Sequence, residues 1–163
     1  MDLYDELTAV VRVFAENDFD YAICGGIAVA FHGYERFTQD IDILVREKDL
    51  DRAHSLLEGA GFLDQSGKIP FRHHDLYRLT KFDGPDYLLV DLLVVNDTLE
   101  DAWRSRLMYD WQGAKICVVS RQGLALMKRM AGRDQDLLDL KKLGLDDEAT
   151  RRPTDDNPAD NRG

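Results

Sequence analysis

Two aspartates separated by one residue, Asp40 and Asp42, stand at the start of an apolar run that continues to Val45. Side chains alternate between the two faces of a β-strand, so both carboxylates are expected to project from the same face. Neighbouring carboxylates at the end of a buried strand repel each other and lose hydration, which requires a compensating positive charge. Oxygen ligands of this kind suit a hard divalent cation.

A glycine pair, Gly25 and Gly26, precedes the aspartates at the end of an expected strand over residues 20–24. The next residues, 27–33, are expected to form a short helix. Backbone N–H groups at such a turn, together with the helix dipole, can bind a phosphate. Metal-binding carboxylates beside a phosphate cradle indicate phosphoryl or nucleotidyl transfer.

A third carboxylate, Asp91, is the single charged residue of the apolar segment 88–95. It shares a strand face with Leu89 and Leu93, so an isolated charge there would be costly and must be paired, hydrogen-bonded, metal-bound or protonated. The residues alone leave two interpretations open. Asp91 is either a third metal ligand or a structural aspartate whose oxygens accept hydrogen bonds from backbone N–H groups.

These features resemble the signature of the nucleotidyltransferase superfamily, in which a Gly-Gly or Gly-Ser turn and a short helix are followed by Asp-x-Asp on the next strand. The signature here reads Gly25-Gly26-Ile27-Ala28 and then Arg36-Phe37-Thr38-Gln39-Asp40-Ile41-Asp42. It is most similar to a small prokaryotic branch that includes AbiEii-type toxins and the lincosamide and aminoglycoside adenylyltransferases.

The resemblance implies that a nucleoside monophosphate is moved from an NTP to a hydroxyl acceptor, with release of pyrophosphate. Asp40, Asp42 and Asp91 would hold two Mg²⁺ ions, or Mn²⁺ in their place, and Asp91 would take the acceptor proton. The acceptor could be a small molecule, a protein side chain or a tRNA end. A toxin of a toxin–antitoxin pair and an antibiotic-modifying enzyme both remain open. The alternative is a non-catalytic nucleotide-binding or protein-interaction module with the same fold.

Six residues are expected to bind the nucleotide under this resemblance: Gly25, Gly26, Arg36, Thr38, Lys128 and Arg133. Arg36 either clamps a phosphate or faces solvent, and Thr38 is expected to stabilise the turn before the aspartates. Lys128 lies where similar transferases carry a lysine beside the active site. Arg133 could instead pair with an aspartate of the following helix and hold two helices together.

Composition narrows the class of protein and of partner. With 163 residues, of which 44% are hydrophobic and 32% charged, the chain suits one soluble domain. Its net charge of −10 argues against extended contacts with nucleic acid, but not against a nucleotide, a cationic acceptor or a tRNA end. The first residues are acidic and lack the basic and apolar regions of a signal peptide, no apolar run approaches the roughly 20 residues that a membrane helix needs, and two cysteines do not suggest a disulfide framework, so a cytoplasmic location is expected. A homodimer and a cognate antitoxin remain open as assemblies.

Periodicity predicts one α/β domain over residues 1–145, with a mixed sheet flanked by helices, and a disordered tail over 146–163. Helices are expected at 2–17, 27–33, 48–60, 98–110, 120–130 and 134–143. Strands are expected at 20–24, 40–45, 76–82, 87–95 and 115–119. The turn sequence at 83–86 predicts an antiparallel hairpin between 76–82 and 87–95.

Overall fold

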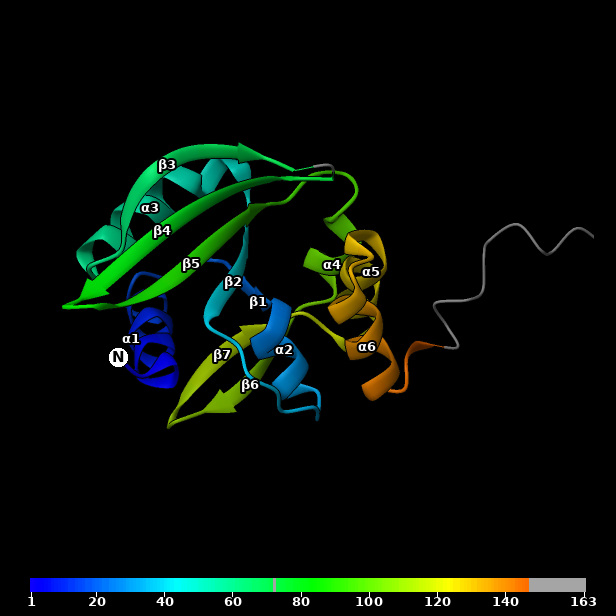
Figure 1. The fold of residues 1–163 in the computed structure, drawn as a ribbon. Coiled ribbons are helices and arrows are strands. Elements are labelled where there is room, and N and C mark those ends of the chain that lie inside the picture. Colours follow the sequence, from blue (N-terminus) through cyan, green and yellow to red (C-terminus); the bar gives the residue numbers. More distant parts are fainter. Residues whose placement is uncertain (72, 147–163) are drawn as a thin grey trace, which may run out of the picture.

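The computed structural model describes residues 1–71 and 73–146, which form one seven-stranded mixed sheet flanked by helices (Figure 1). The strands are β1 Ala22–Cys24, β2 Asp40–Val45, β3 Leu63–Pro70, β4 Asp75–Asp83, β5 Asp86–Val94, β6 Leu107–Trp111 and β7 Ala114–Val118. The helices are α1 Leu3–Glu16, α2 Gly25–Phe31, α3 Leu50–Gly59, α4 Glu100–Arg104, α5 Arg121–Ala131 and α6 Asp134–Lys142, with a 3₁₀ turn at Glu47–Asp49. The fold class predicted from the sequence is therefore confirmed.

The sheet has the order β3-β4-β5-β2-β1-β7-β6. Strand β2 runs parallel to β5 and β1 runs parallel to β7, whereas the other neighbours are antiparallel. The two strands that carry the predicted aspartates, β2 and β5, are thus direct neighbours near the middle of the sheet.

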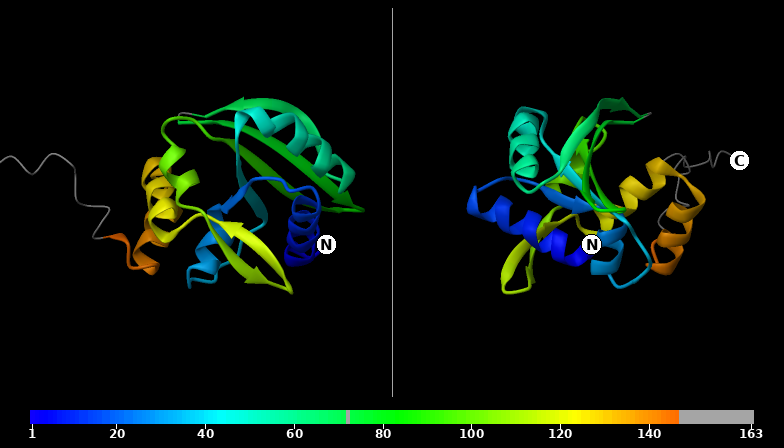
Figure 2. Two further views of the ribbon diagram at one scale, coloured as in Figure 1. Left: turned by 180° about the vertical axis from the view of Figure 1, so that it is seen from behind. Right: turned by 60° about the vertical axis from the view of Figure 1, so that its left-hand side comes forward.

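The two faces of the sheet are covered by different helices. Helices α1 and α3 lie on one side of the curved sheet, and α2, α5 and α6 lie on the other (Figures 1 and 2). Residues on the first face, such as Ile41, Ile43, Val90 and Leu92, are fully buried. Because side chains alternate, the aspartates of β2 and β5 are directed to the opposite face.

The predicted hairpin is confirmed, with Asp83 opposite Asp86 at its turn. The helix expected over 98–110 is wrong, since α4 ends at Arg104 and the following residues form β6. A two-residue turn with positive φ at Gln112 and Gly113 joins β6 to β7, which is the usual geometry of a tight hairpin. Strand β3 was also not expected, because it is an exposed edge strand with an irregular register and no apolar alternation.

Most of the tail expected at 146–163 lies outside the described residues. In the described part of the chain, none of the helices combines the length and the apolar character that crossing a membrane requires.

The contact between α4 and α5 yields a first test. A Cβ added at Gly123 would lie 2.2 Å from Ser105 Oγ and 3.2 Å from Ala102 Cα, so Gly123→Ala is expected to push the helices apart and lower the free energy of unfolding by about 1–3 kcal/mol. The matched control is Gly59→Ala, whose Cβ would meet nothing within 4 Å and which should be neutral or slightly stabilising. Urea unfolding measures both, and equal effects would contradict the close approach of α4 and α5.

Candidate active site

A row of four side chains crosses the sheet where β1, β2, β5 and β4 lie side by side. Asp42 pairs with Cys24 on β1 and with Asp91 on β5, and Asp91 in turn pairs with Arg78 on β4. Paired residues on adjacent strands point to the same face, so the structure brings Asp42 and Asp91 together as the sequence predicted. Asp40 lies on the same face, two residues before Asp42.

Arg78 binds Asp91 through two parallel hydrogen bonds. Its Nε donates to Oδ1 and its Nη2 donates to Oδ2, each at 2.8 Å. This bidentate geometry is the strongest form of an arginine–carboxylate pair. Asp91 is only 4% exposed, so the pair satisfies the buried charge that the sequence indicated. Sequence reasoning did not identify Arg78.

The carboxylates of Asp40 and Asp42 have no such partner among residues 1–71 and 73–146. Burial raises the pKa of Asp42 to about 7, with additional contributions from the charges of Asp91 and Asp40. Burial also raises the pKa of Asp40, and the charge of Asp91 adds to this shift. Neither aspartate gains a hydrogen bond that would favour its charged form within the described residues. The two carboxylates are therefore destabilised in the ligand-free chain.

Gly25 allows α2 to begin directly against Asp42. Its φ is +62°, and a Cβ at this position would lie 1.9 Å from Asp42 Oδ2. A side chain is thus excluded both by backbone conformation and by space. The predicted juxtaposition of the glycine turn and the aspartate pair is present in the structure.

Gly26 is packed against the turn that precedes β2. A Cβ there would lie 2.7 Å from Thr38 Oγ1 and 3.3 Å from Arg36 Nη1. Both residues that were expected to bind nucleotide from this turn are therefore next to the glycines. Thr38 also occupies the space that a side chain at position 26 would need.

Arg36 and Lys128 are held by Asp139, which is fully buried. Arg36 donates from Nε and Nη2 to the Asp139 carboxylate at 2.8 and 2.9 Å, and Lys128 Nζ lies 2.9 Å from Asp139 Oδ2. Arg36 is thus neither solvent-facing nor free, because 18% of its side chain is exposed and its guanidinium is bound.

Lys128 also contacts Asp136, at 3.1 Å, and Arg133 donates to the same carboxylate from Nε at 2.8 Å. Arg133 therefore pairs with an aspartate of α6, as one of the two predicted alternatives stated. Three cations surround two aspartates in this α5–α6 cluster, which leaves one positive charge in excess. Two of these cations, Lys128 and Arg133, lower the pKa of Asp42, so the field of the cluster reaches the carboxylate row.

The carboxylates of the row differ in what their oxygens contact. Among residues 1–71 and 73–146, no group of three or more His, Cys, Asp or Glu side chains is arranged to hold a metal ion. The three expected aspartates therefore do not form such a group, and both oxygens of Asp91 are bound to Arg78. Asp40 and Asp42 are partly buried and offer hard carboxylate oxygens of the kind that Mg²⁺ prefers.

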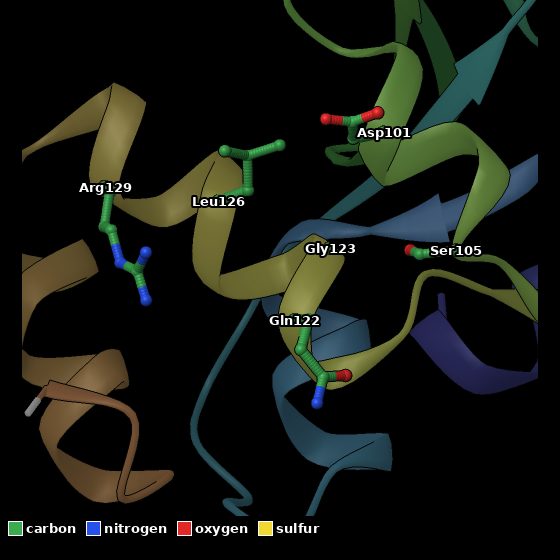
Figure 3. A pocket seen from close by; sticks show the side chains of 6 residues that line it. All are labelled: Asp101, Ser105, Gln122, Gly123, Leu126 and Arg129. Atoms are coloured by element: carbon green, nitrogen blue, oxygen red, sulfur yellow. The ribbon is translucent and has the colours of Figure 1, made fainter. Parts of the chain in front are cut away.

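Two pockets lie elsewhere on the molecule, and neither is lined by Asp40, Asp42 or Asp91. A pocket of about 290 Å³ lies between α4 and α5, where Asp101 and Ser105 face the α5 residues Gln122, Gly123, Leu126 and Arg129 (Figure 3). A second, of about 530 Å³, is lined by residues near the end of α1 and by β6 and β7. The carboxylate row contributes to neither.

The raised pKa of Asp42 gives a pH test. Its folded-state pKa of about 7 exceeds the ordinary value of 3.8, so ionisation opposes folding and this cost grows as the pH rises from 4 to 7. In metal-free buffer, Asp42→Asn is expected to be more stable than the parent chain by about 2–4 kcal/mol above pH 7 and equal to it near pH 4. Urea unfolding at several pH values checks this, with Asp51→Asn on exposed α3 as the control. Parallel curves for parent and Asp42→Asn would contradict it.

The α5–α6 cluster gives a stability test. Asp139→Asn removes the negative charge that Lys128 and Arg36 share in a buried site. We expect it to lower the free energy of unfolding by about 3–5 kcal/mol. Asp134→Asn changes an exposed aspartate of the same helix and should alter stability by less than about 0.5 kcal/mol. Thermal and urea unfolding compare the two, and a small effect of Asp139→Asn would show that the cluster contributes little to the fold.

Comparison with solved structures supports the assignment of the fold. The lincosamide adenylyltransferase LnuA, solved with lincomycin bound, matches with a TM-score of 0.63 and 18% identity over 87% of this chain and 96% of its own. ANT(2″)-Ia in complex with adenylyl-2″-tobramycin matches with a TM-score of 0.57 and 14% identity over 88% of this chain and 84% of its own. A candidate nucleotidyltransferase from Thermotoga maritima matches with a TM-score of 0.60 and 14% identity over 87% of this chain and 94% of its own.

No curated protein sequence matches the chain significantly. A family model described as an uncharacterised nucleotidyltransferase matches residues 1–127, which include the glycine turn and all three aspartates of the predicted site. Since this match spans most of the chain, the protein belongs to that family of nucleotidyltransferases.

Proposed function

We propose that the chain is a metal-dependent nucleotidyltransferase that moves a nucleoside monophosphate from an NTP to a hydroxyl acceptor and releases pyrophosphate. The observation that carries this proposal is the state of Asp40 and Asp42. Asp42 lies against Gly25 and Asp40 precedes it by two residues on the same strand face, burial raises the pKa of each, and neither forms an ion pair or side-chain hydrogen bond within residues 1–71 and 73–146. A bound cation and nucleotide would supply the missing charge.

In this proposal, Asp40 and Asp42 bind Mg²⁺, or Mn²⁺ in its place. When bound, such an ion neutralises phosphate oxygens and increases the acidity of a hydroxyl group. The backbone N–H groups of Gly25 and Gly26 would contact the phosphates, with the Thr38 hydroxyl beside them. These chain groups position the nucleotide, and position and charge account for most of the rate in phosphoryl chemistry.

The three expected basic residues would act in different ways. Arg133 has 77% of its side chain exposed and can reach a phosphate while it remains bound to Asp136. Lys128 is only 5% exposed and is held by two aspartates, so it would act through its field on Asp42 rather than by contact. Arg36 would mainly fix the turn that carries Thr38, because its guanidinium is bound to Asp139.

The acceptor is proposed by analogy with the structural neighbours. One of these was solved with lincomycin and another with an adenylylated aminoglycoside. A small hydroxylated acceptor is therefore the first class to test here, with ATP as the first donor, and the net charge of −10 is compatible with a cationic molecule. A protein side chain and a tRNA end remain alternatives. An enzyme that uses NTPs would work in the cytoplasm.

Transfer can be tested without knowing the acceptor. The chain is incubated with each α-labelled NTP, Mg²⁺ and a cell extract, and labelled products are separated by size and charge. We expect a labelled product that falls by at least about 100-fold in Asp40→Asn and in Asp42→Asn, because the cation loses a ligand. Asp51→Asn, an exposed aspartate of α3, should retain labelling.

The outcomes separate the competing functions. Magnesium-dependent nucleotide binding without any labelled product would favour the non-catalytic module, and no nucleotide binding at all would contradict the proposal. Expression in a host then distinguishes the enzyme's roles. Growth arrest that Asp42→Asn abolishes would indicate a toxin, whereas acquired drug resistance would indicate an antibiotic-modifying enzyme.

A further inference from the structure

We propose that Arg78 is the second cation of this site, held on Asp91 in place of a second metal ion, so that the chain binds one divalent cation rather than two. The inference rests on the proposed function and defines its metal requirement. It also differs from the expectation drawn from the sequence, in which all three aspartates shared two ions.

The first support is the geometry of the row. Arg78 stands directly opposite Asp91 in the β4–β5 register, and Asp91 stands opposite Asp42 in the β5–β2 register. The guanidinium therefore approaches Asp91 from the side away from Asp42. Two hydrogen bonds of 2.8 Å fix both oxygens of Asp91, so the carboxylate is oriented toward Arg78 and not toward the other two aspartates.

The second support is the charge of the site in the ligand-free chain. Asp40, Asp42 and Asp91 carry three negative charges when ionised, and Arg78 with one divalent cation supplies three positive charges. A second divalent ion would leave an excess of positive charge in a partly buried site, or it would have to displace Arg78 from Asp91. Displacement would separate a buried bidentate pair, which is among the more costly changes a protein site can undergo.

The third support is that Arg78 is the cation in contact with the row. Arg36, Lys128 and Arg133 are bound to the aspartates of α6, and none of them contacts Asp91 among the described residues. Their charge reaches Asp42 only through space. Arg78 is therefore the chain's own counterion for the third carboxylate.

The exposure of Arg78 indicates a second task. The pair with Asp91 uses Nε and one N–H of Nη2, which leaves three of the five guanidinium N–H groups available. The side chain is 39% exposed although its partner is buried. These N–H groups can donate to phosphate oxygens of a nucleotide, and the Asp91 pair would hold them in one orientation as a rigid fork.

Titration with Mn²⁺ alone tests the metal stoichiometry, because the electron paramagnetic resonance signal of free Mn²⁺ reports how many ions the full chain binds. We expect one ion per chain for the parent. Asp91→Asn should still bind one ion per chain, though more weakly because Arg78 loses its counterion, whereas Asp42→Asn should lose the ion. Arg78→Gln frees Asp91 and should either add a second ion or tighten the first by about tenfold. The double variant Asp91→Asn/Arg78→Gln should return to the parent's behaviour.

Two ions per chain in the parent, one of which is lost in Asp91→Asn, would overturn this inference and leave the proposed transferase intact. No Mn²⁺ binding by either the parent or Arg78→Gln would overturn both. Asp91→Asn keeps the size and hydrogen-bonding capacity of the side chain, so the test stands even if Arg78→Gln fails to fold. Arg78→Lys adds a further check, because it keeps the charge and should also bind one ion.

Discussion

Asp42 and Asp91 face each other on adjacent parallel strands, and most of the surrounding structure depends on this opposition. Neighbouring strands are about 4.8 Å apart, so two charges meet at short range, and the opposite face of β2 and β5 carries the buried apolar residues Ile41, Ile43, Val90 and Leu92. One of them, Asp91, is compensated locally by Arg78. The other presses against Gly25, where a side chain would collide with it. The glycine turn, the hairpin that carries Arg78 and the α5–α6 cluster are all arranged around this pair.

The cations of the site fall into two groups according to what holds them. Arg36, Lys128 and Arg133 share two aspartates of α6, so their positions are fixed by the packing of α5 on α6 and only part of their charge remains uncompensated. Lys128 is the buried member of this group, and the two carboxylates that hold it offset the cost of its desolvation. Arg78 differs because it belongs to the sheet and contacts the acidic row itself. The site thus has a group of fixed cations beside α5 and α6, and one cation on the sheet, Arg78, that contacts the aspartates directly.

Much of this arrangement follows from the sequence, and the part that does not has identifiable physical causes. The alternation of β2 predicted the shared face of Asp40 and Asp42, and the turn at 83–86 predicted the hairpin. That turn also fixes the register of the hairpin. Once Asp83 pairs with Asp86, counting back along both strands places Arg78 opposite Asp91.

Other features had no comparable local signal. Strands β3 and β6 are exposed edges whose residues lack apolar alternation, so hydrogen bonding to a neighbouring strand decides their conformation. The partners of Arg36 lie about a hundred positions away in the chain, and only the packing of α6 beside the β2 turn brings Asp139 to it. Contacts of this kind depend on tertiary structure and cannot be read from spacing.

The different treatment of the buried acids also bears on whether the site is functional. Asp91, Asp136 and Asp139 each receive two or more charge-assisted hydrogen bonds, as expected of acids that stabilise a fold. Asp42 receives none from the part of the chain that the structure describes, and burial raises its pKa to about 7, so its ionised form opposes folding. A purely structural role would favour asparagine at this position. A carboxylate that weakens the fold is explained more simply by a ligand that binds its charged form, because the free energy of that binding offsets the cost of ionisation. A carboxylate at position 42 is thus better explained by a ligand-binding site than by a purely structural role.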